Sequence, residues 1–406
     1  MTARRTVAAA VALGCALLPG AAGSAAVQVD RVGSGEGLLG GSQAVRVWDA
    51  ALAHTAQLLP TDDSGSVVAP SDAQVQTQRV LARLASALSA AGSSLDDVIR
   101  LNAVVGDTQS AAALQRGIER HFPAEARPSV TLVQGALPDP RALVAVDAVA
   151  VARRGAGLRT VQMVAGTASN AGAFGTALIG ILPIGPRVYV SGRAADGEPA
   201  EAAADVLRQL EETLRFLRLP RSQIVQLKCF LRPVSSAPDV ASAISKHFEG
   251  QAPAVVFVEW SNRQTIEIEA VAASDPALAD GSVAVEYLTP TGQTASPVFS
   301  RVTRMHRPDA IYLSTLNGRT PDRGGLQIRE MFADLARILK LAGSDLLHLA
   351  KATYFVSDDR TSRMLNEIRP EFFDPQRPPA ASKASVPGTA VAGRSLAVDM
   401  IAAPRL

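Results

Sequence analysis

One stretch of this chain occurs three times, and the repetition constrains the fold more than any other feature. In residues 122–151, a helix end leads into two runs of alternating apolar residues separated by a proline-rich turn, which is the pattern of a β-hairpin. The same pattern returns at residues 251–274 and 376–403, at intervals of about 125 residues. The sequence therefore predicts three copies of one structural unit.

Each copy contains the same succession of predicted elements: strand, helix, strand, helix, strand, strand. The second helix of each unit carries three apolar residues at four-residue spacing: Leu114, Ile118 and Phe122; Val240, Ile244 and Phe248; Met364, Ile368 and Phe372. We expect an α+β fold in which each unit is one mixed sheet with two helices on one face.

The predicted domain boundaries follow these repeats. They are residues 27–155, 158–276 and 281–406, joined by short segments rich in Gly, Ala, Pro and Asp. The second face of each sheet is also apolar and must be covered. Since three units are present in one chain, we expect them to cover one another as an intrachain pseudo-trimer, with the chain itself a monomer.

The N-terminal residues 1–26 have the pattern of a secretory signal peptide. Arg4 and Arg5 precede an apolar run, and small residues end near position 26. General secretion fits this pattern better than the alternative, twin-arginine export. The mature protein is therefore expected in the periplasm or secreted, with no membrane association after cleavage.

Charge and cysteine content exclude several classes of partner. Loss of Arg4 and Arg5 lowers the formal net charge from +2 to zero, so we expect no nucleic-acid partner. After cleavage Cys229 is the only cysteine, which excludes an intrachain disulfide and favours a buried core position over a reactive thiol. The five histidines show no metal-ligand spacing, so we predict no metal.

Several short segments resemble the Rid (reactive intermediate deaminase) family, also called the YjgF or L-PSP endoribonuclease-like family. They are VYVSG at 188–192, FPAEARPSV at 122–130, IEIEAVA at 266–272, LAKATYFVSD at 349–358 and RPPAASK at 377–383. The resemblance implies a chorismate-mutase-like fold. Family members are typically homotrimers with a ligand cleft between neighbours, so this chain resembles a trimer written as one polypeptide.

The resemblance also implies a set of site residues and no cofactor. An arginine at the position of Arg127 grips the substrate carboxylate, and a glutamate at the position of Glu267 orients water for attack on a C=N carbon. Ser129 stands where relatives carry a small thiol or hydroxyl residue. Ser191 and Gly192 match a step that offers backbone donors to the ligand.

The three clefts differ in which of these site residues they contain. Ala145 and Ala397 replace the glutamate in the first and third units, whereas Ala252 replaces the arginine in the second. The third unit is expected to use Arg377 for substrate binding, and Phe299 matches a ligand-stacking ring. Arg127 and Arg377 also fit ordinary surface arginines, and Phe299 fits a core residue.

Arg127 and Glu267 serve one ligand only if the fold brings their two walls together.

Two functions follow from the resemblance. The first is an exported enzyme that hydrolyses imines or enamines to ketones and ammonia. The alternative is a catalytically silent protein that keeps the ring and binds a small carboxylate or carbonyl ligand. A nuclease role finds no basic groove in the sequence.

Overall fold

The computed structural model describes residues 27–155, 157–166, 173–321 and 324–405, which form three six-stranded sheets. The signal peptide predicted for residues 1–26 lies outside these ranges. None of the helices in these ranges is long and apolar enough to cross a membrane.

The three sheets have the same strand order. The first sheet runs β5 (Ser129–Gln134), β4 (Val98–Val105), β6 (Val144–Val151), β3 (Leu52–Thr55), β8 (Ile179–Leu182) and β7 (Gln162–Val164). The second runs β11 (Ala254–Glu259), β10 (Ile224–Leu231), β12 (Ile266–Ala273), β9 (Arg187–Ala195), β14 (Val302–Met305) and β13 (Val285–Leu288). The third runs β17 (Ala380–Ser385), β16 (Leu349–Val356), β18 (Leu396–Ala402), β15 (Ala310–Leu313), β2 (Ser42–Trp48) and β1 (Gln28–Ser34).

The hairpin predicted from the repeated stretch is wrong in one respect. Its two strands, β5 and β6, do not pair with each other, because β4 lies between them. β4 pairs with β5 in parallel and with β6 antiparallel, and the other two sheets repeat this arrangement. Alternating apolar residues identify a strand but not its neighbour.

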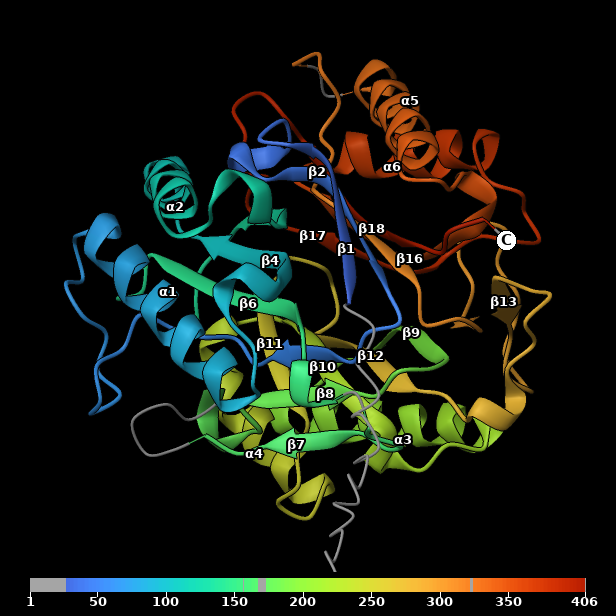
Figure 1. The fold of residues 1–406 in the computed structure, drawn as a ribbon, viewed down its shortest axis with the longest axis horizontal. Helices are drawn as coiled ribbons and strands as arrows, with labels where there is room; N and C mark the ends of the chain where they lie inside the picture. Colours follow the sequence, from blue (N-terminus) through green and yellow to red (C-terminus); the bar gives the residue numbers. More distant parts are fainter. Residues whose placement is uncertain (1–26, 156, 167–172, 322–323, 406) are drawn as a thin grey trace, which may run out of the picture.

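Each sheet takes strands from two of the sequence units. The hairpin β7–β8 lies in the second unit of the sequence but completes the first sheet, and β13–β14 lies in the third unit but completes the second sheet. The N-terminal hairpin β1–β2 completes the third sheet by pairing with β15. Figure 1 shows this hairpin, in blue, beside the red strands of the C-terminal part. The two ends of the chain thus share one sheet and close the ring.

Two helices cover the outer face of each sheet, as predicted. They are α1 (Ala73–Ala90) and α2 (Thr108–His121), α3 (Pro199–Leu217) and α4 (Ala237–His247), and α5 (Gly325–Leu341) and α6 (Asp359–Ile368). The side chains of Asp72, Asp107 and Asp358 cap the N-termini of α1, α2 and α6. Three separate apolar cores form between helices and sheets, one for each sheet. Cys229 is buried in the second of them, as expected.

The inner faces of the three sheets pack against one another. One shared apolar cluster contains Ile99, Val225 and Ala350 from equivalent positions of β4, β10 and β16. A second shared cluster contains Phe230 and Phe355. Burial of these inner faces confirms the predicted α+β fold, in which three tandem modules surround a common centre.

Candidate functional site

The strand register defines which residues are equivalent in the three modules. Ser129 pairs with Arg100 of β4, and the matching positions of β11 and β17 are Ala254 and Ala380. The residues two positions earlier are therefore Arg127, Ala252 and Pro378. The prediction that Arg377 occupies the arginine position of the third module is wrong by one residue, because Pro378 occupies it.

Arg127 lies half-buried at the junction between the first and third sheets. Its Nη1 donates a hydrogen bond to the carbonyl of Gly40 at 3.0 Å, and its own carbonyl accepts from the Ser42 hydroxyl at 2.6 Å. The glycine-rich loop between β1 and β2 therefore packs on this guanidinium. The buried Arg127 Nε has no hydrogen-bond partner among the described residues.

The opposite wall of the Arg127 site, which we call the arginine cleft, comes from the third module. The Ser314 hydroxyl accepts from the Val130 N–H at 2.7 Å, and the Thr315 N–H donates to the Val130 carbonyl at 2.9 Å. In the third sheet Ala397 pairs with Phe355, just as Glu267 pairs with Phe230 in the second. The arginine cleft therefore has its cation but no catalytic carboxylate on the facing module.

Glu267 lies at a different junction, between the second and third sheets. Its carboxyl group packs directly over Gly192, where an added Cβ would overlap with Oε1. The Ser382 hydroxyl of β17 faces the same carboxyl group. Burial raises the pKa of Glu267 to about 7, although the hydroxyl and Lys351 favour the ionised form. A carboxyl group with this pKa exchanges protons readily at neutral pH.

Ser191 and Ser300 hold the two walls of this second site, the glutamate cleft, together. The Ser191 hydroxyl donates to the Ser300 carbonyl at 2.6 Å and accepts from the Ala381 N–H at 2.7 Å. The Ser191 N–H is already bonded to the Arg301 carbonyl at 3.0 Å. It is thus not a free donor for a ligand, and the predicted binding role of this backbone group is wrong. Gly192 has a structural role instead, because any side chain at this position would overlap with Glu267.

Two other predicted residues have different surroundings from those expected. Ser129 is fully buried, and its hydroxyl donates to the Ile99 carbonyl at 3.0 Å, so it does not face a ligand. Arg377 stacks on the Tyr287 ring with its guanidinium carbon 5.7 Å from the ring centroid. Phe299 is partly exposed, and the Arg301 guanidinium covers its ring at 4.7 Å. The predicted ligand-stacking role of Phe299 stays a prediction.

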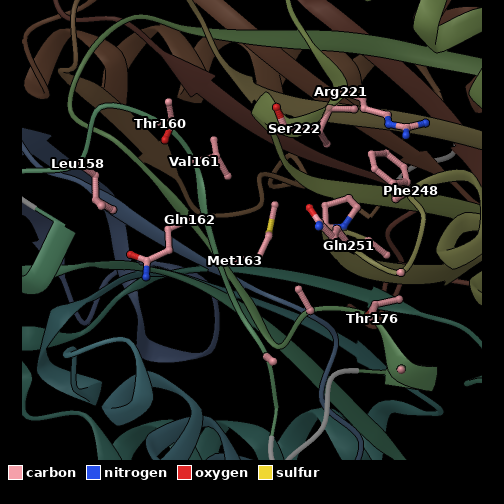
Figure 2. A pocket seen from close by; sticks show the side chains of 17 residues that line it. Leu158, Thr160, Val161, Gln162, Met163, Thr176, Arg221, Ser222, Phe248 and Gln251 are labelled. Atoms are coloured by element: carbon pink, nitrogen blue, oxygen red, sulfur yellow. The ribbon is translucent and has the colours of Figure 1, made fainter.

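The third junction, between the first and second sheets, lacks both functional groups. Ala252 and Ala145 occupy the arginine and glutamate positions there. A cavity of about 690 Å³ borders Ala252, lined by the β7 segment on one side and by residues after α4 on the other. Figure 2 shows Met163 and Gln251 near its middle. Its lining is mostly neutral, and Arg221 at its edge is paired with Glu249.

The fold does not bring Arg127 and Glu267 together. The contacts of Arg127 are with the β1–β2 loop, whereas those of Glu267 are with β9 and β17. The hypothesis that these two residues serve one ligand across an interface is therefore wrong. The wall that faces Arg127 has Ala397 at the glutamate position, and the wall that faces Glu267 has Pro378 at the arginine position.

Sequence reasoning missed two residues of the clefts, Gly40 and Ser382. Gly40 lies 87 positions from the guanidinium it contacts. Ser382 was recognised only as part of a motif. No local pattern predicts such contacts, because they depend on which modules are neighbours in the ring.

Comparisons with known proteins agree with this architecture. The family described as Endoribonuclease L-PSP matches residues 42–152. The 3-aminoacrylate deaminase RutC of Acinetobacter baylyi is 34% identical over 99 residues, which cover 24% of this chain and 78% of RutC.

Solved structures of single modules are also similar. A conserved Rid-family protein of unknown function from Yersinia pestis, YyfB, is 32% identical and covers 28% of this chain and 87% of its own, with a TM-score of 0.25. A YjgF-family member from Neisseria meningitidis is 18% identical and covers 30% and 96%, with a TM-score of 0.23. The chain belongs to the Rid/YjgF family and carries three modules of its fold.

Proposed function

We propose that this protein hydrolyses imines or enamines at a single cleft, with Glu267 as its acid–base group. The observation that carries the proposal is the position of Glu267, a partly buried carboxyl group over Gly192 with a pKa of about 7. The similarity to a deaminase, RutC, supports the same class of reaction.

The proposed reaction needs only water and this carboxyl group. Glu267 as carboxylate takes a proton from water while the oxygen adds to the C=N carbon. The protonated carboxyl group then returns the proton to nitrogen, which gives a carbinolamine. The carboxylate next takes the hydroxyl proton of the carbinolamine and delivers it to nitrogen, so that the C–N bond breaks as the C=O bond forms and ammonia leaves. No metal or cofactor takes part in this scheme.

The glutamate cleft differs from the predicted clamp in how it selects its substrate. Pro378 replaces the arginine that would grip a carboxylate, and Arg377 is engaged with Tyr287. We therefore expect the substrate imine to be accepted without a carboxylate beside the C=N bond. A guanidinium fork is the group best suited to hold such a carboxylate, and none occupies its position here.

The first prediction concerns Glu267→Gln. Purified mature protein is incubated with imines generated in situ by an amine oxidase or an amino-acid oxidase, and loss of the imine is followed. We expect the protein to accelerate hydrolysis, and the substitution to lower kcat/KM by about 10²–10⁴-fold. Glu371→Gln, at an exposed glutamate paired with Arg329, is the matched control and should retain full activity. If the wild-type protein does not accelerate hydrolysis of either imine, the enzymatic proposal is rejected.

The pH dependence of this activity is a second prediction. The carboxylate form of Glu267 acts as the base, so kcat/KM should rise with pH through about 7 and level off above it. An ordinary exposed glutamate would place this limb near its usual pKa of 4.5. A pH–rate profile between 5 and 9 measures it, and a flat profile over that range contradicts the assigned role.

A second function is favoured by a separate observation, the state of Arg127. This half-buried guanidinium has a nitrogen without a partner and lies in a cleft with no facing glutamate. Binding of a small carboxylate there, without catalysis, is the alternative. Pyruvate at one hundred times its Kd should then stabilise the protein by about 2.7 kcal/mol, seen as a higher Tm. Arg127→Lys should remove this shift, because lysine cannot bind a carboxylate through two parallel hydrogen bonds.

Export of the protein is part of the same proposal. We propose that residues 1–26 direct the chain out of the cytoplasm and are then removed. Intact mass measurement of the protein from periplasmic and culture-medium fractions tests it: a mature form that begins near position 27 is expected there, and an uncleaved chain confined to the cytoplasm contradicts it.

A further inference from the structure

A small cavity of about 40 Å³ lies where the three sheets meet. Each sheet contributes side chains from equivalent positions to its wall. One such set is His54, Tyr189 and Tyr312, from β3, β9 and β15, and another is Arg100, Gln226 and Lys351, from β4, β10 and β16. The cavity is far too small for a substrate and is distinct from the three clefts.

Several polar groups at this cavity are buried and only partly paired. The hydroxyl groups of Tyr189 and Tyr312 are each 1% exposed and interact with each other, with no other hydrogen-bond partner among the described residues. The ring of His54 interacts with Gln226 and is neutral, because burial and the nearby Arg187 lower its pKa to about 3. Two facing hydroxyl groups can make only one hydrogen bond to each other, so at least one hydroxyl hydrogen of the tyrosine pair is left for an acceptor in the cavity. A buried donor that stays unpaired costs about 1–3 kcal/mol.

The charges around the cavity are unequal. Its wall contains three cations, Arg100, Lys228 and Lys351, but only two carboxylates, Glu269 and Asp399. Arg100 pairs with Asp399, and Lys351 pairs with Glu269 at 2.5 Å. This leaves the Lys228 ammonium, whose nearest carboxylate oxygen, on Glu269, is 3.7 Å away and already engaged.

Two neighbouring groups belong to the same network. Asp147, at the position equivalent to Glu269 and Asp399, is a third carboxyl group; burial raises its pKa, whereas Lys228 and Arg100 lower it. Arg187 is fully buried two residues before Tyr189, and only its Nη2 is bonded, to the Pro308 carbonyl, while Nε and Nη1 lack partners. An uncompensated charge in a protein interior is strongly unfavourable. A counter-charge at the cavity would remove the excess.

We propose that the cavity binds one small monovalent anion of halide size, with the Lys228 ammonium and the Tyr189 and Tyr312 hydroxyls as its donors. Only a monatomic ion or a few water molecules fit in about 40 Å³, which excludes phosphate, sulfate and substrate carboxylates. A cation is excluded by the three positive side chains of the wall. The anion would link the second and third modules at the common centre of the ring, so its expected effect is on the stability of the ring.

Bromide, used as a heavier substitute for chloride, tests the proposal directly. The protein is refolded and crystallised in sodium bromide, and anomalous scattering is measured at the bromine absorption edge. A peak within hydrogen-bond distance of the two tyrosine hydroxyls is expected. Water alone in the cavity, without an anomalous peak, overturns the proposal.

Thermal unfolding provides an independent measurement with a matched control. The Tm of the wild-type protein should rise with chloride concentration when gluconate keeps the ionic strength constant. Tyr189→Phe/Tyr312→Phe removes both hydroxyls with almost no change of shape and should abolish this dependence. Tyr354→Phe removes another buried hydroxyl, which interacts with Arg369 in the core beneath α5 and α6 and away from the cavity, and should leave the dependence intact.

Two outcomes of the thermal measurement contradict the anion site. The first is an equal chloride dependence in the wild-type protein and the double tyrosine variant. The second is the absence of any chloride dependence in the wild-type protein. The bromide measurement needs no variant, so the proposal remains testable even if the double variant does not fold.

Discussion

Deletion of residues 27–48 should prevent the chain from reaching its native state, although these residues precede the first predicted strand–helix repeat. They form β1 and β2, two of the six strands of the third sheet. Val45 and Val47 of β2 are 0% and 1% exposed and belong to the apolar cluster shared by all three sheets. The deletion would also leave β15 as an unpaired edge strand, which promotes association between chains. We expect aggregation or loss of cooperative unfolding, measured by light scattering and circular dichroism.

A circular permutant tests whether folding needs the β1–β2 hairpin itself or also its position at the start of the chain. In the first and second sheets, the completing hairpin follows the last strand of its own module in the sequence. A chain that starts at residue 51 and carries residues 27–50 after residue 405 reproduces this order in the third sheet. This permutant should fold as a monomer with a Tm close to that of the wild-type protein. A deletion variant with wild-type stability would contradict the role assigned to the hairpin.

Substitution of Lys351 by methionine should be the most destabilising single change in the central polar network. Lys351 and Glu269 form an ion pair at 2.5 Å, and both side chains are 7% exposed. Removal of the lysine leaves the Glu269 carboxylate buried, with Lys228 at 3.7 Å as its remaining cation. Loss of one partner of such a pair typically costs about 3–5 kcal/mol. Urea denaturation measures the change in the free energy of unfolding.

The double variant Lys351→Met/Glu269→Gln distinguishes the value of the ion pair from the cost of an unpaired charge. Because the desolvation of both charged groups is then avoided, we expect it to be closer in stability to the wild-type protein than Lys351→Met is. The exposed pair Arg329–Glu371 is the control, and Arg329→Met should cost only about 0.2–1 kcal/mol. Equal losses in the buried and exposed pairs would contradict this account.

The elements of one module and their threefold repetition could be predicted from local sequence patterns. Four-residue spacing, as in Leu114, Ile118 and Phe122, is a local signal for a buried helix face, and all three residues are fully buried. It did not determine strand neighbours, because alternation reports only that two faces differ. β4 therefore lies between β5 and β6, where a hairpin was expected.

The separation of Arg127 and Glu267 into two sites could not be predicted without the packing of the three modules. Arg127 and Glu267 were recognisable from short motifs, but whether they share a cleft depends on the order of the modules around the ring. The ring places Ala397 opposite the arginine position and Pro378 opposite the glutamate position. The central cavity was equally inaccessible to sequence reasoning, since the charged side chains of its wall come from five strands far apart in the chain. Local patterns report how a segment folds, whereas contacts between distant segments follow from packing of the whole molecule.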